Sequence, residues 1–201
     1  MHPTSPAHAR WDAPSPAFEA SWGKVMMWLF LLSDTLTFSG LLGGYGYLRA
    51  SSEAWPVPEA IFNVNLVGLM TFLLICSSAT MAAAVGAARQ GETVKTGRLL
   101  GLTVLGGLIF LAMQAYEWTH FIHAGARLAS NPWGVPLFST TFFVITGFHG
   151  LHVTAGVIYL TTVALRALQG RLDANGVETA GLYWHFVDLV WVFVFTFLYL
   201  I

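Results

Sequence analysis

The sequence predicts an all-α membrane protein, a bundle of about five transmembrane helices. Hydrophobic residues make up 56% of its 201 residues and charged residues only 9%. The mean hydropathy is +0.65, a composition suited to lipid as solvent. The apolar residues also gather in five runs of about 20 residues or more, each long enough to cross roughly 30 Å of hydrocarbon.

The first three predicted spans are bounded by charged or helix-breaking residues. Residues 24–48 form the first apolar run, and the prolines of Trp55-Pro56-Val57-Pro58 separate it from the second, residues 62–88. The polar segment 89–96 then leads into the third span, residues 97–122.

The last two predicted spans are residues 137–168 and 180–201. The turn-rich string Asn131-Pro132-Trp133-Gly134 precedes the fourth span, and Asp173-Ala-Asn-Gly176 separates it from the fifth. No stretch is left for a second folded unit, so residues 22–201 are predicted to form one transmembrane domain.

The remaining segment, residues 1–21, is rich in Pro, Ala, Ser and His and is predicted to be a disordered tail. It has neither the basic start nor the short apolar core of a signal peptide. Cys76 is the only cysteine, which excludes an internal disulfide and a thiolate metal cluster. No basic patch indicates binding to nucleic acid.

Basic residues are distributed unevenly between the two sides of the predicted bundle. Seven lie on one side and two on the other; the seven are Arg10, Lys24, Arg89, Lys95, Arg98, Arg166 and Arg171, and the two are Arg49 and Arg127. Cytoplasmic loops carry the excess of Lys and Arg. The N-terminus is therefore predicted to be cytoplasmic and the C-terminus, after an odd number of spans, periplasmic or otherwise extracytoplasmic.

Polar and ionisable residues lie inside these apolar spans, where they are costly and usually functional. They are Asp34, Gln114, Glu117, His149, His152, His185 and Asp188. Spacings of three residues place Gln114 with Glu117, His149 with His152, and His185 with Asp188 on shared helix faces. The simplest interpretation is a polar network, in which these groups pair with one another and with Ser, Thr and Tyr hydroxyls to hold the bundle together.

A metal or haem site is the sharpest alternative. Glu117 and His120 have the carboxylate–histidine spacing of di-iron bundle proteins, and His149 with His185 could hold a haem between two helices. Depth argues against one shared metal. At about 1.5 Å per residue, Glu117 lies near the outer end of the third span, whereas His185 lies within about 15 Å of the cytoplasmic start of the fifth. No metal or cofactor is predicted on this chain.

Asp34 differs from the other polar residues because it is an acid within the first span with no basic residue nearby in the sequence. A charged group at the membrane centre costs about 2.5–3.5 kcal/mol on insertion scales. Asp34 is therefore either protonated or placed against a polar partner on another helix or subunit. Both a role in proton uptake or subunit contact and a packing role stay open. For His185 and Asp188, we predict packing against the fourth span.

From Trp22 to Ile201 the chain resembles subunit III of the haem-copper respiratory oxidases, in the five-helix form of many bacterial oxidases. The matching strings, in order, are Leu32–Ser39, Gln114–Glu117, Ser139–Phe143, Thr146–Val153 and Tyr183–Trp191. The resemblance implies a subunit of the bacterial cytoplasmic (inner) membrane without redox centres of its own. Such a subunit stabilises subunit I, binds phospholipid and supports proton uptake.

The resemblance also implies which subunits and cofactors accompany the chain in its complex. Haems and copper are expected in partner subunits, with subunit I in direct contact, and subunit II, small subunits and a larger respiratory supercomplex as further partners. In the family, the carboxyl at the position of Asp34 faces subunit I near its proton-entry region. The complex would reduce oxygen to water and translocate protons, with either cytochrome c or quinol as electron donor.

Two other functions stay open at this point. One is the subunit III-like protein of nitric oxide reductase systems, although Gln114-x-x-Glu117 and Phe148-His-Gly-Leu-His152 favour the oxidase. The other is an independent membrane transporter or metalloenzyme. A transporter would be expected to carry inverted repeats with broken helices, and the sequence shows no convincing internal repeat.

Overall fold

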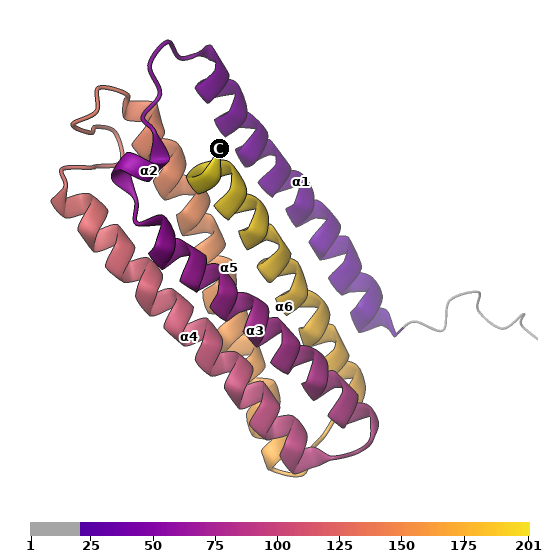
Figure 1. Cartoon of the computed structure of the whole chain (residues 1–201). Coiled ribbons are helices and arrows are strands. Elements are labelled where there is room, and N and C mark those ends of the chain that lie inside the picture. Colours follow the sequence, from indigo (N-terminus) through magenta and orange to yellow (C-terminus); the bar gives the residue numbers. More distant parts are fainter. Residues whose placement is uncertain (1–20) are drawn as a thin grey trace, which may run out of the picture.

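The computed structural model describes residues 21–201 as a bundle of long, roughly parallel or antiparallel helices (Figure 1). Five of them are long and apolar enough to cross a membrane, which confirms the predicted fold class. The long helices are α1 (Trp22–Ser51), α3 (Val64–Arg89), α4 (Thr93–His123), α5 (Pro136–Leu168) and α6 (Ala174–Phe195), the last continued by the π-helical turn η1 (Thr196–Leu200). The predicted tail lies, apart from Ser21, outside the described residues.

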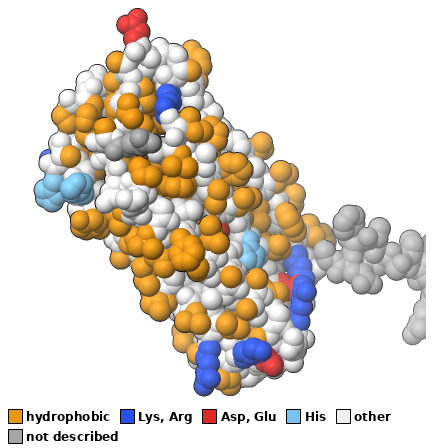
Figure 2. Space-filling view, in the orientation of Figure 1, with side chains coloured by type: hydrophobic (Ala, Val, Ile, Leu, Met, Phe, Trp, Pro, Cys, Tyr) orange, Lys and Arg blue, Asp and Glu red, His pale blue; other side chains and the backbone are white. Residues whose placement is uncertain are grey.

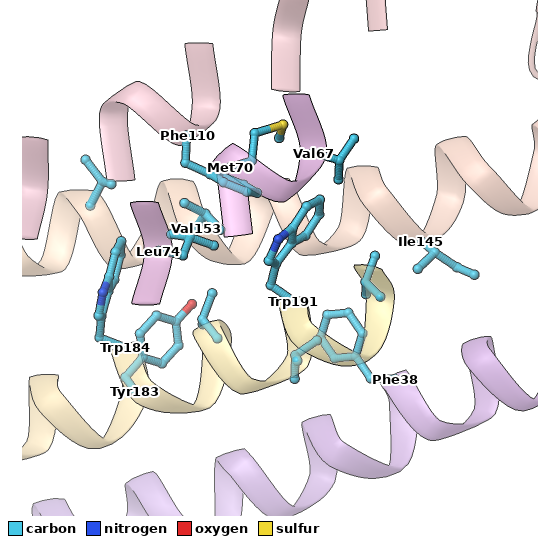
Figure 3. Close-up of a cluster of buried hydrophobic side chains, with 14 of the residues drawn as sticks. Phe38, Val67, Met70, Leu74, Phe110, Ile145, Val153, Tyr183, Trp184 and Trp191 are labelled. Atoms are coloured by element: carbon cyan, nitrogen blue, oxygen red, sulfur yellow. The ribbon is translucent and has the colours of Figure 1, made fainter. Parts of the chain in front are cut away.

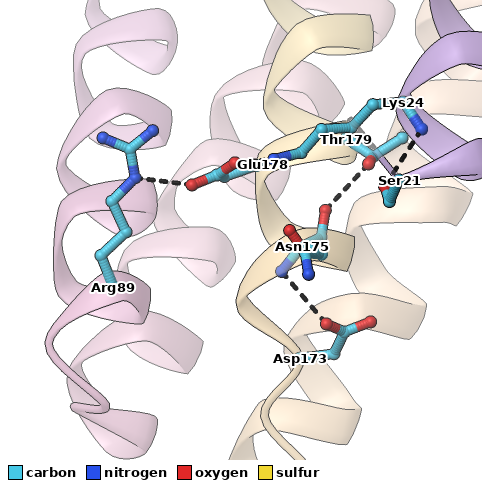
Figure 4. Close-up of polar contacts among 7 residues, drawn as sticks. All are labelled: Ser21, Lys24, Arg89, Asp173, Asn175, Glu178 and Thr179. Atoms are coloured by element: carbon cyan, nitrogen blue, oxygen red, sulfur yellow. Dashed lines mark hydrogen bonds and ion pairs between the residues drawn. The ribbon is translucent and has the colours of Figure 1, made fainter. Parts of the chain in front are cut away.

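Several helix starts differ from the sequence-based boundaries, among them that of α4, which begins at Thr93 rather than at residue 97, and two of the differences have a visible local cause. The second predicted span is divided into the short helix α2 (Pro58–Ile61) and α3, because Asn63 interrupts the helix and its side chain accepts a hydrogen bond from the amide of Leu66, at 3.2 Å. The last span begins six residues earlier than predicted, at Ala174. Here the carboxylate of Asp173 accepts from the amide of Asn175, at 3.1 Å, so the expected turn is the capped first turn of α6 (Figure 4).

Helix α6 lies at the centre of the bundle and α1 at its edge (Figure 1). The central helix packs against α1, α3 and α5, while α3 packs against α4 and α4 against α5. Half of the most apolar window of α6 is buried, compared with 22% for α1. The position of α1 therefore depends on fewer contacts than that of any other span among the described residues.

The core is built around two tryptophans of α6, Trp184 and Trp191, neither of which has any exposed surface (Figure 3). Trp184 donates a hydrogen bond from Nε1 to Oγ of Ser77 in α3, at 3.0 Å. Its ring lies against Gly107 of α4 and Gly156 of α5, where a Cβ would approach within 2.6 Å and 3.0 Å. Glycine at these two positions gives the ring room between the helices.

An ionic cluster joins three helices at one end of the bundle. Glu178, near the start of α6, pairs with Lys24 of α1 and with Nε of Arg89 at the end of α3, the latter at 2.6 Å (Figure 4). In the space-filling view, most of the visible basic side chains gather at this end, below a broad apolar surface (Figure 2). This separation of charge agrees with the uneven count in the sequence.

Candidate functional site: polar pairs between the spans

The carboxyl of Asp34 in α1 faces His152 in α5. Oδ2 of Asp34 lies 3.2 Å from Nε2 of His152, and the two side chains are only 8% and 14% exposed. The structure thus supplies a polar partner on another helix, one of the possibilities that the sequence left open. Contact between Asp34 and another subunit stays a prediction.

The tautomer of His152 is fixed by its other ring nitrogen. Nδ1 lies 2.8 Å from the backbone carbonyl oxygen of Phe148, which can only accept a hydrogen bond, so Nδ1 carries a proton. The contact between Nε2 and Oδ2 of Asp34 can therefore take up one further proton, either on the carboxyl or on the imidazole. Asp34 and His152 form an acid–base pair.

Aromatic side chains surround this pair where α1, α5 and α6 meet. Phe38 of α1 lies edge-on to the ring of His152, with centroids 5.5 Å apart, and Phe148 lies 4.7 Å away. The hydroxyl of Tyr183 in α6 donates to the backbone oxygen of His152, at 2.9 Å. The pair is therefore held in a largely apolar enclosure with little room for solvent.

Glu117 and Gln114 of α4 form a second buried group, as their spacing predicted. The Oε2 atom of Glu117 accepts from Nε2 of Gln114 at 3.3 Å and from the hydroxyl of Tyr199 at 2.8 Å. The contact with Tyr199 ties α4 to η1. Sequence reasoning missed Tyr199, although its position near the outer end of the last span matches the depth of Glu117.

The prediction that His185 and Asp188 pack against the fourth span is wrong. Nδ1 of His185 lies 2.5 Å from the hydroxyl oxygen of Ser78 in α3, the second span. Asp188 is near the same hydroxyl, but neither of its carboxyl oxygens has a hydrogen-bond partner among residues 21–201. The side of α6 that faces α5 is taken by Tyr183 and Trp184, which contact His152 and Gly156. His185 and Asp188 are consequently turned toward α3.

His149 shares the aromatic neighbour Phe38 with His152 but does not share its polar partners, despite their spacing. Its ring has no exposed surface and lies between Trp191 and Phe110, at centroid distances of 5.0 and 5.7 Å. Among residues 21–201, neither ring nitrogen has a hydrogen-bond partner. The expected pairing of His149 with a hydroxyl is therefore not found in this part of the chain.

The polar groups thus occupy separate helix interfaces: α1 with α5, α4 with η1, and α3 with α6. Within the described residues, no three His, Cys, Asp or Glu side chains are grouped so that they could hold a metal ion. The arrangement of these residues suits hydrogen bonding and proton exchange.

Several hollows open on the surface of the bundle, and two of them have distinctive linings. A groove of about 500 Å³ runs between α1 and α6, and its lining is almost entirely apolar: Thr35, Phe38, Ser39, Leu42, Gly43, Phe186, Leu189, Val190, Phe193 and Phe197. A smaller pocket of about 230 Å³ lies where α5 ends and α6 begins. Tyr159, Arg166, Arg171 and Asp173 supply its polar lining.

Comparison with known proteins decides the family. The sequence model of the family described as cytochrome c oxidase subunit III matches residues 20–201. The chain belongs to this family.

Individual subunit III proteins match over most of their length. The quinol oxidase subunit 3 of Bacillus subtilis (strain 168) is 33% identical over 199 residues, covering 96% of this chain and 95% of that protein. The cytochrome c oxidase subunit 3 of Synechocystis sp. is 38% identical over 179 residues, covering 86% and 73%. That of Bacillus sp. (strain PS3) is 34% identical over 176 residues, covering 86% and 83%.

These similarities agree with the resemblance that the strings in the spans indicated. With five membrane-spanning helices and subunit III relatives from bacteria, the chain is a multi-pass protein of the bacterial cytoplasmic membrane. The relatives are named for both quinol and cytochrome c, so family membership does not select one electron donor.

Proposed function

We propose that this chain is the accessory, non-redox subunit III of a proton-pumping haem-copper terminal oxidase, and that Asp34 and His152 support proton uptake by subunit I. Family membership supports the place in the oxidase complex. Haems and copper belong to partner subunits in this proposal. Within this chain, the acid–base pair at membrane depth carries the argument.

A purely structural contact between α1 and α5 would not need ionisable groups. Two hydroxyls, or a hydroxyl and a backbone carbonyl, would join the helices at lower cost in lipid. An Asp–His pair can in addition hold a proton and release it. Both side chains keep a small exposed area, so a proton can reach the pair from outside the bundle. We place subunit I at that opening.

The test is Asp34→Asn, which keeps the shape and hydrogen bonding of the side chain but removes the acid. The complex should assemble, and its oxygen consumption should fall in part, most at alkaline pH, where protons are scarce. His152→Gln should behave in the same way, because it removes the base of the pair. Glu53→Gln is the matched control, since Glu53 is an exposed acid that follows the end of the same helix. Parent-like oxygen consumption and pumping in both variants at every pH would exclude the proton-related role.

The same proposal includes bound phospholipid. The groove between α1 and α6 has the apolar lining that suits acyl chains, and the pocket with Arg166 and Arg171 offers two guanidinium groups to a lipid phosphate. Asp173 lines this pocket as well, but its carboxylate is engaged by the amide of Asn175. Native mass spectrometry of the complex should show less co-purified anionic lipid for Arg166→Gln than for Arg98→Gln, which alters a basic residue of α4 outside both hollows. Equal lipid content in the two variants would exclude this headgroup site.

A further inference from the structure

A short polar chain lies along the seam between α3 and α6, within the membrane span. It consists of the hydrogen-bonded side chains of Ser78 and His185, and the carboxyl of Asp188 lies beside them without a hydrogen-bond partner among residues 21–201. Asp188 is only 7% exposed, whereas Ser78 and His185 are part-buried and reach the surface of the bundle. Figure 2 shows a histidine surface within the otherwise apolar area over α3 and α6.

The outer end of this chain is the Nε2 atom of His185. Nδ1 is occupied by the hydroxyl of Ser78, at 2.5 Å, and Nε2 has no hydrogen bond to any residue of the described chain. If Nδ1 of the neutral ring donates to the Ser78 hydroxyl, Nε2 is an acceptor. If the hydroxyl donates to Nδ1 instead, Nε2 carries the ring proton and is a donor.

Other intramembrane histidines differ from His185 in this respect. Both ring nitrogens of His152 have partners inside the chain, Phe148 and Asp34. His149 is fully enclosed, so no group from outside can reach it. His185 alone among these three presents an unused ring nitrogen at the surface.

Acyl chains of lipid cannot form a hydrogen bond with Nε2 of His185. His185 lies 11 residues after the start of α6, about 16 Å along the helix, where acyl chains offer neither donor nor acceptor. The residues around it are apolar and strongly exposed: Ile75 is 54% and Leu189 55% exposed. A polar centre in an apolar rim is the form expected for a contact between helices of two membrane subunits.

We propose that the seam between α3 and α6 is an interface for a transmembrane helix of another oxidase subunit, and that a hydroxyl or amide side chain of that helix bonds to Nε2 of His185. Hydroxyl and amide groups can both donate and accept, so they match either direction of the hydrogen bond between Ser78 and His185. This inference rests on the proposed function, because it requires assembly with other subunits.

The experiment places a photo-crosslinking benzoylphenylalanine at Ile75 of α3, an exposed position outside the groove between α1 and α6, in the complete complex in native membranes. We expect a crosslink to a transmembrane segment of another oxidase subunit, with a Ser, Thr, Asn, Gln or Tyr near the crosslinked residue. Irradiation that joins Ile75 to lipid or a small molecule, while other subunits co-purify, would overturn this inference alone. If no oxidase subunit co-purifies with the parent chain, the proposed function fails as well.

Two substitutions at His185 test the hydrogen bond itself. His185→Gln keeps a donor and an acceptor, so its crosslink yield from Ile75 should stay near that of the parent. His185→Leu removes both, and the fraction of chain that dissociates from the complex should rise about threefold to tenfold, as expected for one hydrogen bond between membrane helices. Equal yield and equal dissociation for the two variants would contradict the proposed bond. The crosslink in the parent sequence remains decisive if the leucine variant does not fold.

Discussion

Gly107→Ala is the substitution that most directly tests how Trp184 sets the spacing of the bundle. A Cβ at this position of α4 would lie 2.6 Å from Cη2 of Trp184 and 2.7 Å from Cγ2 of Val157. Ordinary contact begins at 3.4 Å, so each neighbour would have to retreat by roughly 0.7–0.8 Å. The added methyl group would therefore clash with side chains of two helices at once, α6 and α5.

Neither neighbour can retreat freely. Trp184 has no exposed surface, and its Nε1 is bonded to Ser77, so a tilt of the ring stretches that hydrogen bond. Inserting one methylene-sized group into a well-packed core costs about 1–3 kcal/mol. Because the hydrogen bond is strained as well, we expect a loss of about 2 kcal/mol or more in the free energy of unfolding. That corresponds to about a 30-fold increase in the unfolding equilibrium constant.

The assay is unfolding of the chain in mixed micelles with increasing sodium dodecyl sulfate, followed by tryptophan fluorescence. Gly101→Ala, on the same helix, is the matched control, because its Cβ would meet nothing within 4 Å and alanine favours the helix. Combining Gly107→Ala with Trp184→Phe should recover part of the loss, since the smaller ring leaves room for the methyl group. If Gly107→Ala unfolds with the parent and with Gly101→Ala, the conclusion that Trp184 fixes the distance between α4 and α6 is wrong.

Two further substitutions test polar contacts that lie away from Trp184. Tyr199→Phe removes the hydroxyl that donates to Glu117 and should lower the free energy of unfolding by about 1–2 kcal/mol in the same assay. Tyr116→Phe is the control and should change the free energy of unfolding little, because the ring of Tyr116 is 63% exposed. Glu178→Gln removes two ion pairs and should increase proteolysis at the end of α1 near Lys24. The difference from the parent should shrink at high salt, which screens ion pairs. Glu92→Gln breaks only the pair with Lys95 at the start of α4, so it should not increase proteolysis there.

The sequence predicted the features that depend on the length of apolar runs and on the spacing of polar residues within them. The five spans follow from runs that only lipid or a buried core can accommodate, and the pairing of Gln114 with Glu117 follows from their spacing on one helix. The same kind of reasoning placed His185 against the wrong span. Each residue turns a helix by about 100°, and the rotation of α6 about its axis is set by where Trp184 and Trp191 find room, which no local pattern records.

Other contacts were missed because they join residues far apart in the chain. Ser78 and His185 are 107 positions apart, and Glu117 and Tyr199 are 82 apart. Glu178 lies in a segment that reads as a polar connection, so its ion pairs with Lys24 and Arg89 gave no signal. Depth along the span narrows the possible partners, but only the packed bundle selects one.

The contacts of α1 connect its position with the protonation of Asp34. This helix lies at the edge of the bundle, beside a groove of about 500 Å³, and has the least buried apolar window of the five spans. Its specific polar ties to other helices are few: Lys24 with Glu178 at one end, and Asp34 with His152 within the span. In lipid, helices gain little from hydrophobic contact, so such ties have a large share in holding α1 in place. A change in the protonation of Asp34 and His152 therefore affects the position of α1 as well as the pair itself.

This coupling is also why Asp34→Asn and Asp34→Leu must be compared. The asparagine variant removes the titratable acid but keeps a hydrogen-bonding contact with His152, whereas the leucine variant removes both the acid and the contact.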